Sequence, residues 1–182
     1  MINLGIDVGS VSMKLALIGD SEDKEIFDRI LSECPTFFKI HDGLSSRFYK
    51  REKLILLSQY RRTKGEPVLA TYNLLEELRE YLPEIDGIRV TGSGSALVGE
   101  LLGASQENDF RAVAKGVGIL HPEVKTIFEM GGANSKYIRI NIDEESGIVG
   151  IQDYERNGEC AAGTGSFIDQ QATRLQYDIE DI

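Results

Sequence analysis

The residue types best suited to chemistry gather at a short turn near the N-terminus. Asp7, Gly9, Ser10, Ser12 and Lys14 lie between two apolar segments typical of strands. A glycine here lets backbone N–H groups and hydroxyls approach a phosphate, the acid can hold Mg²⁺ through water, and the lysine adds a positive charge. The segment favours a phosphate-binding turn, while a tight hairpin without a ligand would also explain the glycine.

A second turn of the same design occurs later in the chain. It consists of Glu129, Gly131, Gly132, Asn134, Ser135 and Lys136. Two acid–glycine hairpins that face one another across a cleft are suited to clamping the phosphates of a nucleotide with Mg²⁺. The alternative is that both are structural β-turns. Residues 91–95 form a third glycine-rich strand end that would line the same cleft, although a turn into a helix explains them equally well.

A cysteine marks the most distinctive stretch, residues 157–169 with the sequence NGECAAGTGSFID. Cys160 precedes a Gly-Thr-Gly turn at a predicted helix N-terminus, where free N–H groups favour a thiolate or a bound anion. One cysteine cannot hold an iron–sulfur cluster, which usually needs four thiolates. A small buried residue in a loop is the alternative for Cys160, and Cys34 is expected to be a core residue.

Apolar spacing predicts the elements that position these residues. The segments INLGIDVG and SMKLALIGD are expected to form a hairpin, with residues 25–32 as a third antiparallel strand. We expect a loop and part of a helix over 35–67, a helix over 68–82 ended by Pro83, and a strand over 87–91. Two further helices are predicted over 96–104 and 109–121, the latter capped by Asp109.

The order of strand, acid, glycine turn and lysine-containing strand then occurs a second time, which indicates an internal repeat. Strands are predicted over 124–132, 135–142 and 148–155, followed by a helix over 163–175. We therefore expect a first lobe at 1–122 and the opening part of a second lobe at 123–182. The second lobe is the less complete, so the sequence is expected to be a fragment.

Composition narrows the function classes. The 182 residues contain 30 acidic and 20 basic side chains, a net charge of −10, which disfavours binding to nucleic acids or anionic membrane surfaces. With 41% hydrophobic residues, no apolar run long enough to span a membrane and no signal peptide, the chain is expected to be soluble. Two cysteines far apart in sequence favour the cytoplasm.

Four motifs together resemble the BadF/BadG/BcrA/BcrD ATPase family, the activases of 2-hydroxyacyl-CoA dehydratases and benzoyl-CoA reductases. They are GIDVGSVSMK, VTGSG, EMGGANSKY and NGECAAGTGSFID, in the family's order and approximate spacing. The resemblance implies an α/β, ribonuclease H-like fold of the actin/hexokinase/Hsp70 superfamily, with the first lobe complete and the second truncated. It also implies a homodimer, a CoA-ester dehydratase or reductase as partner, and ferredoxin or flavodoxin as electron donor.

The resemblance also assigns roles to the site residues. Asp7 and Glu129 would be the catalytic carboxylates that work with ATP and Mg²⁺, and Cys160 would bind a 4Fe-4S cluster shared between two subunits. The other nucleotide-binding residues would be Gly9, Ser10, Ser12, Lys14, Gly131, Gly132, Asn134 and Lys136.

Three departures from the family pattern bear on activity. The second turn usually reads D-I-G-G-Q-D-x-K, whereas Glu129, Ala133 and Asn134 replace the first Asp, the Gln and the second Asp. These changes affect the placement of Mg²⁺ and water, so hydrolysis is expected to be slow or absent. No cysteine follows Cys160, and the family's adenosine-binding glycines are expected further downstream, so this chain should bind nucleotide poorly.

Two other functions compete with an activase. A non-catalytic nucleotide-sensing or dimerisation module is favoured by the altered second turn. A sugar kinase of the wider family is disfavoured by the motif CAAGTG, residues 160–165.

Overall fold

The computed structural model describes residues 1–44, 53–143, 145–157 and 164–177. The chain divides into two compact units, Met1–Ala112 and Val113–Ile182. The division falls inside the helix α4 (Asp109–Leu120), earlier in the chain than the boundary expected after residue 122.

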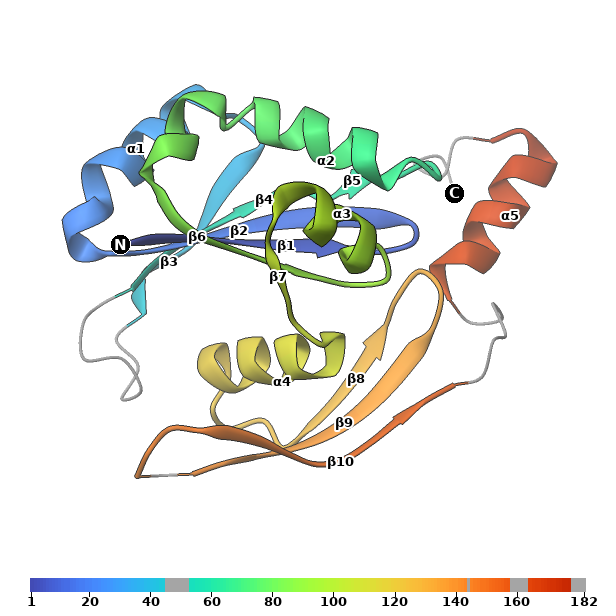
Figure 1. Cartoon of the computed structure of the whole chain (residues 1–182). Helices are drawn as coiled ribbons and strands as arrows, with labels where there is room; N and C mark the ends of the chain where they lie inside the picture. The colour runs from blue at the N-terminus through green and yellow to red at the C-terminus, as the bar shows by residue number, and fades with distance from the viewer. Residues whose placement is uncertain (45–52, 144, 158–163, 178–182) are drawn as a thin grey trace. The chain divides into compact units, whose positions relative to one another are not determined.

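The first unit is built on a mixed sheet (Figure 1). Strands β1 (Ile2–Val8) and β2 (Ser12–Asp20) form the predicted hairpin, and β6 (Ile85–Thr91) pairs with β1 in parallel. The strand order is β3-β4-β2-β1-β6-β7, with β5 beside β2. The remaining strands are β3 (Phe37–Leu44), β4 (Lys53–Ser58), β5 (Arg61–Arg62) and β7 (Ser105–Gln106).

Two predictions for this region are wrong. Residues 25–32 belong to a helix, α1 (Lys24–Glu33), because Phe27 and Ile30 are three residues apart and are buried on one face. The third strand of the meander is instead β4, which pairs with β2. The expected loop and helix over 35–67 are replaced by β3, β4 and β5, since the uninterrupted apolar run of β4 is buried and lacks a diagnostic period.

Two helices cover one face of the sheet (Figure 1). Helix α2 (Pro67–Glu76) begins with a proline at its first turn, as helices favour, and is followed by a 3₁₀ helix, η2 (Arg79–Glu84). The start of the predicted helix over 68–82 is confirmed, but the α-helix ends at Glu76, and Pro83 lies inside the separate 3₁₀ helix instead of ending the first one. Leu74 of α2 and Phe27 and Ile30 of α1 pack on one core with every second residue of β1, from Ile2 to Val8.

The two helices predicted after β6 are confirmed as α3 (Ser95–Leu102) and α4. The capping residue of α4 is Asn108 rather than Asp109, which is already the first helical residue. The Oδ1 atom of Asn108 accepts a hydrogen bond from the backbone N–H of Arg111 at 3.3 Å, the geometry of an N-cap.

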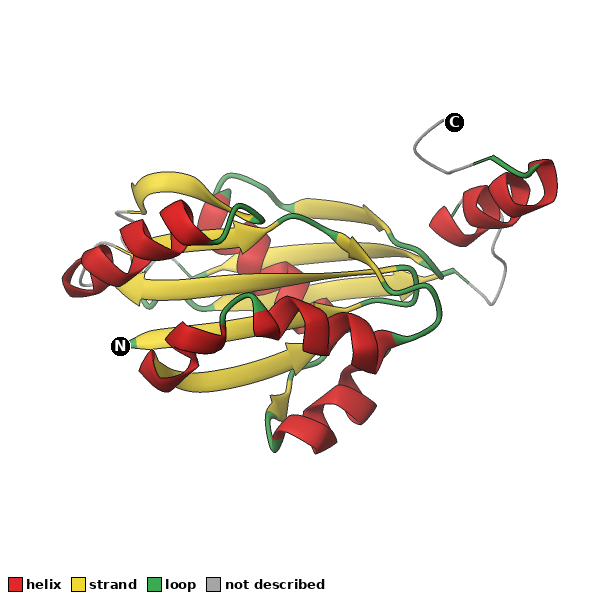
Figure 2. Ribbon diagram, turned by 90° about the horizontal axis from the view of Figure 1, so that it is seen from above, coloured by secondary structure: helices red, strands yellow, loops and turns green. Residues whose placement is uncertain are grey.

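The second unit repeats the opening of the first. Strands β8 (Thr126–Met130), β9 (Ser135–Ile142) and β10 (Val149–Arg156) form an antiparallel sheet in the order β10-β9-β8, followed by α5 (Gly165–Leu175). The strand order matches β4-β2-β1, which confirms the predicted repeat. Figure 2 distinguishes the strands in yellow from the helices in red. Among the described residues, every helix is too short or too polar to cross a membrane.

Candidate functional site

The two acid–glycine turns have the same hydrogen-bond pattern. The N–H of Gly9 donates to the carbonyl of Ser12 at 2.9 Å, and the N–H of Gly131 donates to the carbonyl of Asn134 at 2.9 Å. Each of these glycines lies two residues after the acid of its turn. The repeat predicted from residue order therefore extends to the backbone of both turns.

The register of both hairpins places the acid directly opposite the lysine. Asp7 pairs with Lys14 in the β1–β2 ladder, and Glu129 pairs with Lys136 in the β8–β9 ladder. Residues directly opposite one another in a ladder project to the same face of the sheet. Each turn thus presents a carboxylate and an ammonium group side by side below a glycine turn.

Close packing explains why glycine occupies the turns. A Cβ atom on Gly9 would lie 2.7 Å from the carbonyl oxygen of Ser12, a backbone atom that cannot swing away. A Cβ atom on Gly131 would lie 2.8 Å from Oε1 of Glu129. The backbone of the first turn is therefore too tight for a side chain at Gly9, whereas at Gly131 the Glu129 side chain could move aside and the nearest backbone atom, the carbonyl oxygen of Asn134, lies 3.1 Å away. A turn without a side chain permits close approach of a phosphate to backbone N–H groups.

The end of β6 lies against the first turn. Gly92 has φ +90°, and a Cβ atom there would lie 2.5 Å from the carbonyl oxygen of Val8 and 2.7 Å from Oδ1 of Asp7. The N–H of Gly94 donates to the carbonyl of Val8 at 2.9 Å. The third glycine-rich segment therefore adjoins Asp7. Thr91, opposite Asp7 in the β1–β6 ladder, has a buried hydroxyl without a hydrogen-bond partner among the described residues.

The segment Arg61–Gly65, a strap that begins with β5, holds the first turn from the other side, a contact that local sequence spacing does not predict. Thr63 is 3% exposed, its N–H donates to the carbonyl of Val11 at 2.9 Å, and its hydroxyl donates to the carbonyl of Ser10 at 2.8 Å. These contacts join residues more than 50 positions apart. The tract Arg61–Gly65 between a buried strand and Pro67 is a signal for a turn, but local spacing does not reveal its partner.

The two turns differ in how far the acid and the lysine are exposed to solvent. In the second turn, Nζ of Lys136 donates to Oε2 of Glu129 at 2.6 Å, with Lys136 9% exposed and Glu129 30% exposed. In the first turn, Asp7 and Lys14 are both exposed. The acid and the lysine are thus less accessible to water in the second turn than in the first.

Helix α5 begins beside the second turn. The N–H of Gly165 donates to the carbonyl of Gly131 at 3.1 Å, and a Cβ atom on Gly165 would lie 3.3 Å from Cα of Gly132. Asn157 holds the other side, because its Oδ1 accepts the N–H of Ser135 at 2.8 Å. Both ends of the segment 157–165 therefore contact the second turn. Cys160 lies between them, outside the described residues.

Cys34 is a core residue, as predicted. It is 4% exposed, its Sγ donates to the carbonyl of Glu77 at 3.1 Å, and burial, followed by the nearby carboxylate of Glu77, raises the pKa of its thiol. A thiol held neutral in this way is a poor metal ligand. Within the described part of the chain, no group of three His, Cys, Asp or Glu side chains is arranged to hold a metal ion.

Comparison with known proteins shows the family of the chain. Residues 4–182 match the sequence model of the BadF/BadG/BcrA/BcrD ATPase family. The chain belongs to this family. One relative is the (R)-2-hydroxyglutaryl-CoA dehydratase activating ATPase of Acidaminococcus fermentans. It is 27% identical to this chain over 179 residues, and the matched region covers 98% of this chain and 55% of the relative. The 2-hydroxyisocaproyl-CoA dehydratase activator of Clostridioides difficile is 25% identical over 182 residues, all of this chain and 55% of the relative.

A solved structure confirms the predicted fold class. The activator of the 2-hydroxyisocaproyl-CoA dehydratase from Clostridium difficile with bound ADPNP has a TM-score of 0.60 at 24% identity, over 98% of this chain and 54% of that one. This BadF/BadG/BcrA/BcrD chain therefore has the actin/hexokinase-like α/β fold. It spans about half the length of the relatives it matches.

Proposed function

We propose that the chain is the nucleotide-binding part of an activating ATPase, which couples the binding and hydrolysis of MgATP to low-potential electron transfer toward a CoA-ester dehydratase or reductase. The observation that carries the proposal is the matching pair of acid–glycine turns, each with a lysine opposite the acid. Support comes from family membership and from relatives named as dehydratase activators.

The first turn is the better suited of the two to Mg²⁺ and phosphate. Mg²⁺ in nucleotide sites keeps several waters and takes one or two carboxylates together with substrate phosphates, so a three-acid cluster is unnecessary. Asp7 would supply the carboxylate, and the buried hydroxyl of Thr91 fits a site that holds water or an ion beside it. The N–H groups of the turn and Lys14 would bind the phosphates, with Ser10 and Ser12 as further donors.

In the second turn, Gly131, Gly132 and Asn134 would contact nucleotide through their backbone. The ion pair between Glu129 and Lys136 competes with any role of either group toward Mg²⁺ or phosphate. This competition supports slow hydrolysis.

For the redox function, Cys160 would contribute one thiolate to a 4Fe-4S cluster, which when bound holds and releases one electron at low potential. Four thiolates are the usual set, so a homodimer and further cysteines in the complete protein are required. Because burial raises the pKa of Cys34, that residue does not fit as a ligand. A ferredoxin or flavodoxin would supply the electron, and the reducing cytoplasm is the proposed location.

A nucleotide-sensing module without turnover is the second candidate. The observation that favours it is the internal pairing of Glu129 with Lys136, because it leaves one carboxylate less for catalysis. The two candidates differ in turnover and in iron content, and both predict nucleotide binding.

Two measurements on the complete anaerobically purified gene product separate them. An activating ATPase should contain about four irons per dimer, lost in Cys160→Ser. It should also hydrolyse ATP, with activity lost in Asp7→Asn and retained in Asp28→Asn, a control at an exposed acid of α1. Folded protein with neither iron nor ATPase activity would refute the activase and leave the sensing module.

A further inference from the structure

We propose that Arg62 is a phosphate-contacting residue of the first turn, presented by the strap Arg61–Gly65. The proposal rests on the proposed nucleotide-binding function and adds a cation from a separate strand to the turn. It would make the affinity of this site depend on the number of phosphates of the nucleotide.

The register of the sheet places Arg62 on the site face. Strand β5 pairs with β2 so that Arg62 is directly opposite Ser12, and Arg61 is directly opposite Met13. In β2, Ser12 and Lys14 project to one face and Met13 to the other, because successive side chains alternate. Arg62 therefore leaves the sheet on the face of Ser12, Lys14 and Asp7.

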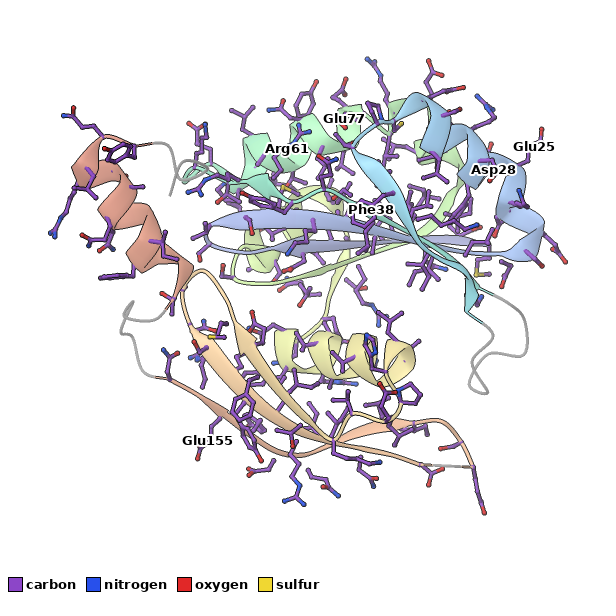
Figure 3. The ribbon with its side chains drawn as sticks, turned by 180° about the vertical axis from the view of Figure 1, so that it is seen from behind. Glu25, Asp28, Phe38, Arg61, Glu77 and Glu155 are labelled. Atoms are coloured by element: carbon purple, nitrogen blue, oxygen red, sulfur yellow. The ribbon has the colours of Figure 1, made fainter. Side chains whose placement is uncertain are left out.

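The neighbouring arginine shows the opposite orientation. Met13 is fully buried on the core face, where the hydroxyl of Thr71 in α2 lies 3.7 Å from its sulfur. Arg61 follows Met13 to this face, and its guanidinium donates to Oε1 of Glu77 at 2.6 Å. Figure 3 labels both residues of this pair, beside α2. Arg61 thus has a structural partner on the α2 face, and alternation sends Arg62 the other way.

The strap holds the backbone of Arg62 firmly. On one side β5 pairs with β2 at both Arg61 and Arg62, and on the other Thr63 makes two hydrogen bonds to the first turn. The chain then reverses through Lys64 and Gly65, with φ of 48° and 78°, and the N–H of Glu66 donates to the carbonyl of Thr63 at 2.8 Å. A cation on a fixed backbone loses less entropy on binding than a cation on a free loop.

The chemistry of the side chain suits a polyphosphate. A guanidinium presents a planar fork of N–H donors that can bind two phosphate oxygens, whereas Lys14 offers a single ammonium group. Arg62 would thus add a forked cation to the ammonium group of Lys14 on this face. Each further contact to a phosphate oxygen favours MgATP over adenosine and favours a triphosphate over a monophosphate.

The test compares two adjacent arginines with the same change in charge. In Arg62→Gln, the affinity for MgATP should fall about tenfold, the loss of a hydrogen bond to a charged group, while the affinity for adenosine stays unchanged. In Arg61→Gln, the affinity for MgATP should stay within about twofold and the stability should fall, since this variant breaks only the pair with Glu77. Arg62→Lys should recover part of the loss, because it keeps the charge without the fork. Titrations followed by NMR measure these affinities even when they are weak.

Equal losses of MgATP affinity in Arg61→Gln and Arg62→Gln would overturn the proposal, because they would show a general effect of charge. Unchanged MgATP affinity in Arg62→Gln would also overturn it, and would leave the proposed nucleotide-binding function standing. Failure of the unaltered chain to bind MgATP at millimolar concentration would overturn both.

Discussion

Replacing Glu129 with glutamine should destabilise the second unit, because it removes a charged partner of a buried ammonium group. Lys136 is 9% exposed and lies 2.6 Å from Oε2 of Glu129. Removing one partner of a fully buried ion pair costs about 3–5 kcal/mol. Glu129 is 30% exposed, so water can reach part of the pair, and we expect Glu129→Gln to lower the free energy of unfolding by about 2 kcal/mol.

A double-mutant cycle isolates the interaction from the general effect of each substitution. Lys136→Met removes the buried charge and leaves a carboxylate that water can solvate, so it should cost less than Glu129→Gln. The double variant should be more stable than the sum of the single effects predicts, by about 1 kcal/mol or more. Glu155→Gln is the matched control, because Glu155 is exposed on β10 and its substitution should change stability by less than about 0.5 kcal/mol.

The assay combines urea unfolding, followed by circular dichroism, with hydrogen exchange of peptides from β8 and β9. Hydrogen exchange separates the two units, because each peptide reports on its own part of the structure. Faster exchange in β8 and β9 without a change in β1 and β2 would show that the substitution destabilises the second unit. If Glu129→Gln were as stable as Glu155→Gln, or if the cycle showed simple additivity, the ion pair would carry no net stabilisation and the reasoning would be refuted.

Three further predictions concern other parts of the chain. Gly92→Ala should lower the free energy of unfolding by about 2–4 kcal/mol, because φ is +90° and the new Cβ would lie 2.5 Å from the carbonyl oxygen of Val8; a thermal unfolding midpoint equal to that of the unaltered chain would contradict this. Cys34 should react with iodoacetamide at pH 8 far more slowly in the folded chain than in urea, because burial raises the pKa of its thiol, and equal rates by peptide mass spectrometry would contradict the burial. Hydrogen bonds from Ser146 lower the pKa of Asp143, so the ionised carboxylate stabilises its turn at pH values above the ordinary carboxyl pKa, and this stabilisation is lost as the pH falls through the lowered pKa. Ser146→Ala should therefore raise the pKa of Asp143 in an NMR titration. An unchanged pKa of Asp143 would show that Ser146 does not lower it.

Local patterns predicted the parts of the structure that depend on neighbours in sequence. The two hairpins, the turn into α3 and the start of α5 were predictable because glycines, acids and strand periods lie within a few residues of one another. The same applies to Asp7 and Lys14, which the hairpin register brings together.

Features set by distant contacts were not predictable in this way. Residues 25–32 contain enough apolar residues for either a strand or a helix, and packing of Phe27 and Ile30 on the sheet decides for α1. The strap of Thr63 on Ser10 and the contact of Gly165 with Gly131 join residues far apart in the chain. The pairing of Glu129 with Lys136 depends on side-chain burial that residue types do not show.

Mapping of backbone amide shifts tests most directly whether the first turn binds the phosphates of a nucleotide. A ¹⁵N-labelled sample of the chain would be titrated with Mg-ADPNP and, separately, with adenosine. We expect saturable shifts for the amides of Gly9–Ser12 and Gly92–Ser95 with Mg-ADPNP and much smaller shifts at these positions with adenosine. Shifts of equal size with both ligands, or shifts confined to residues outside these turns, would contradict it.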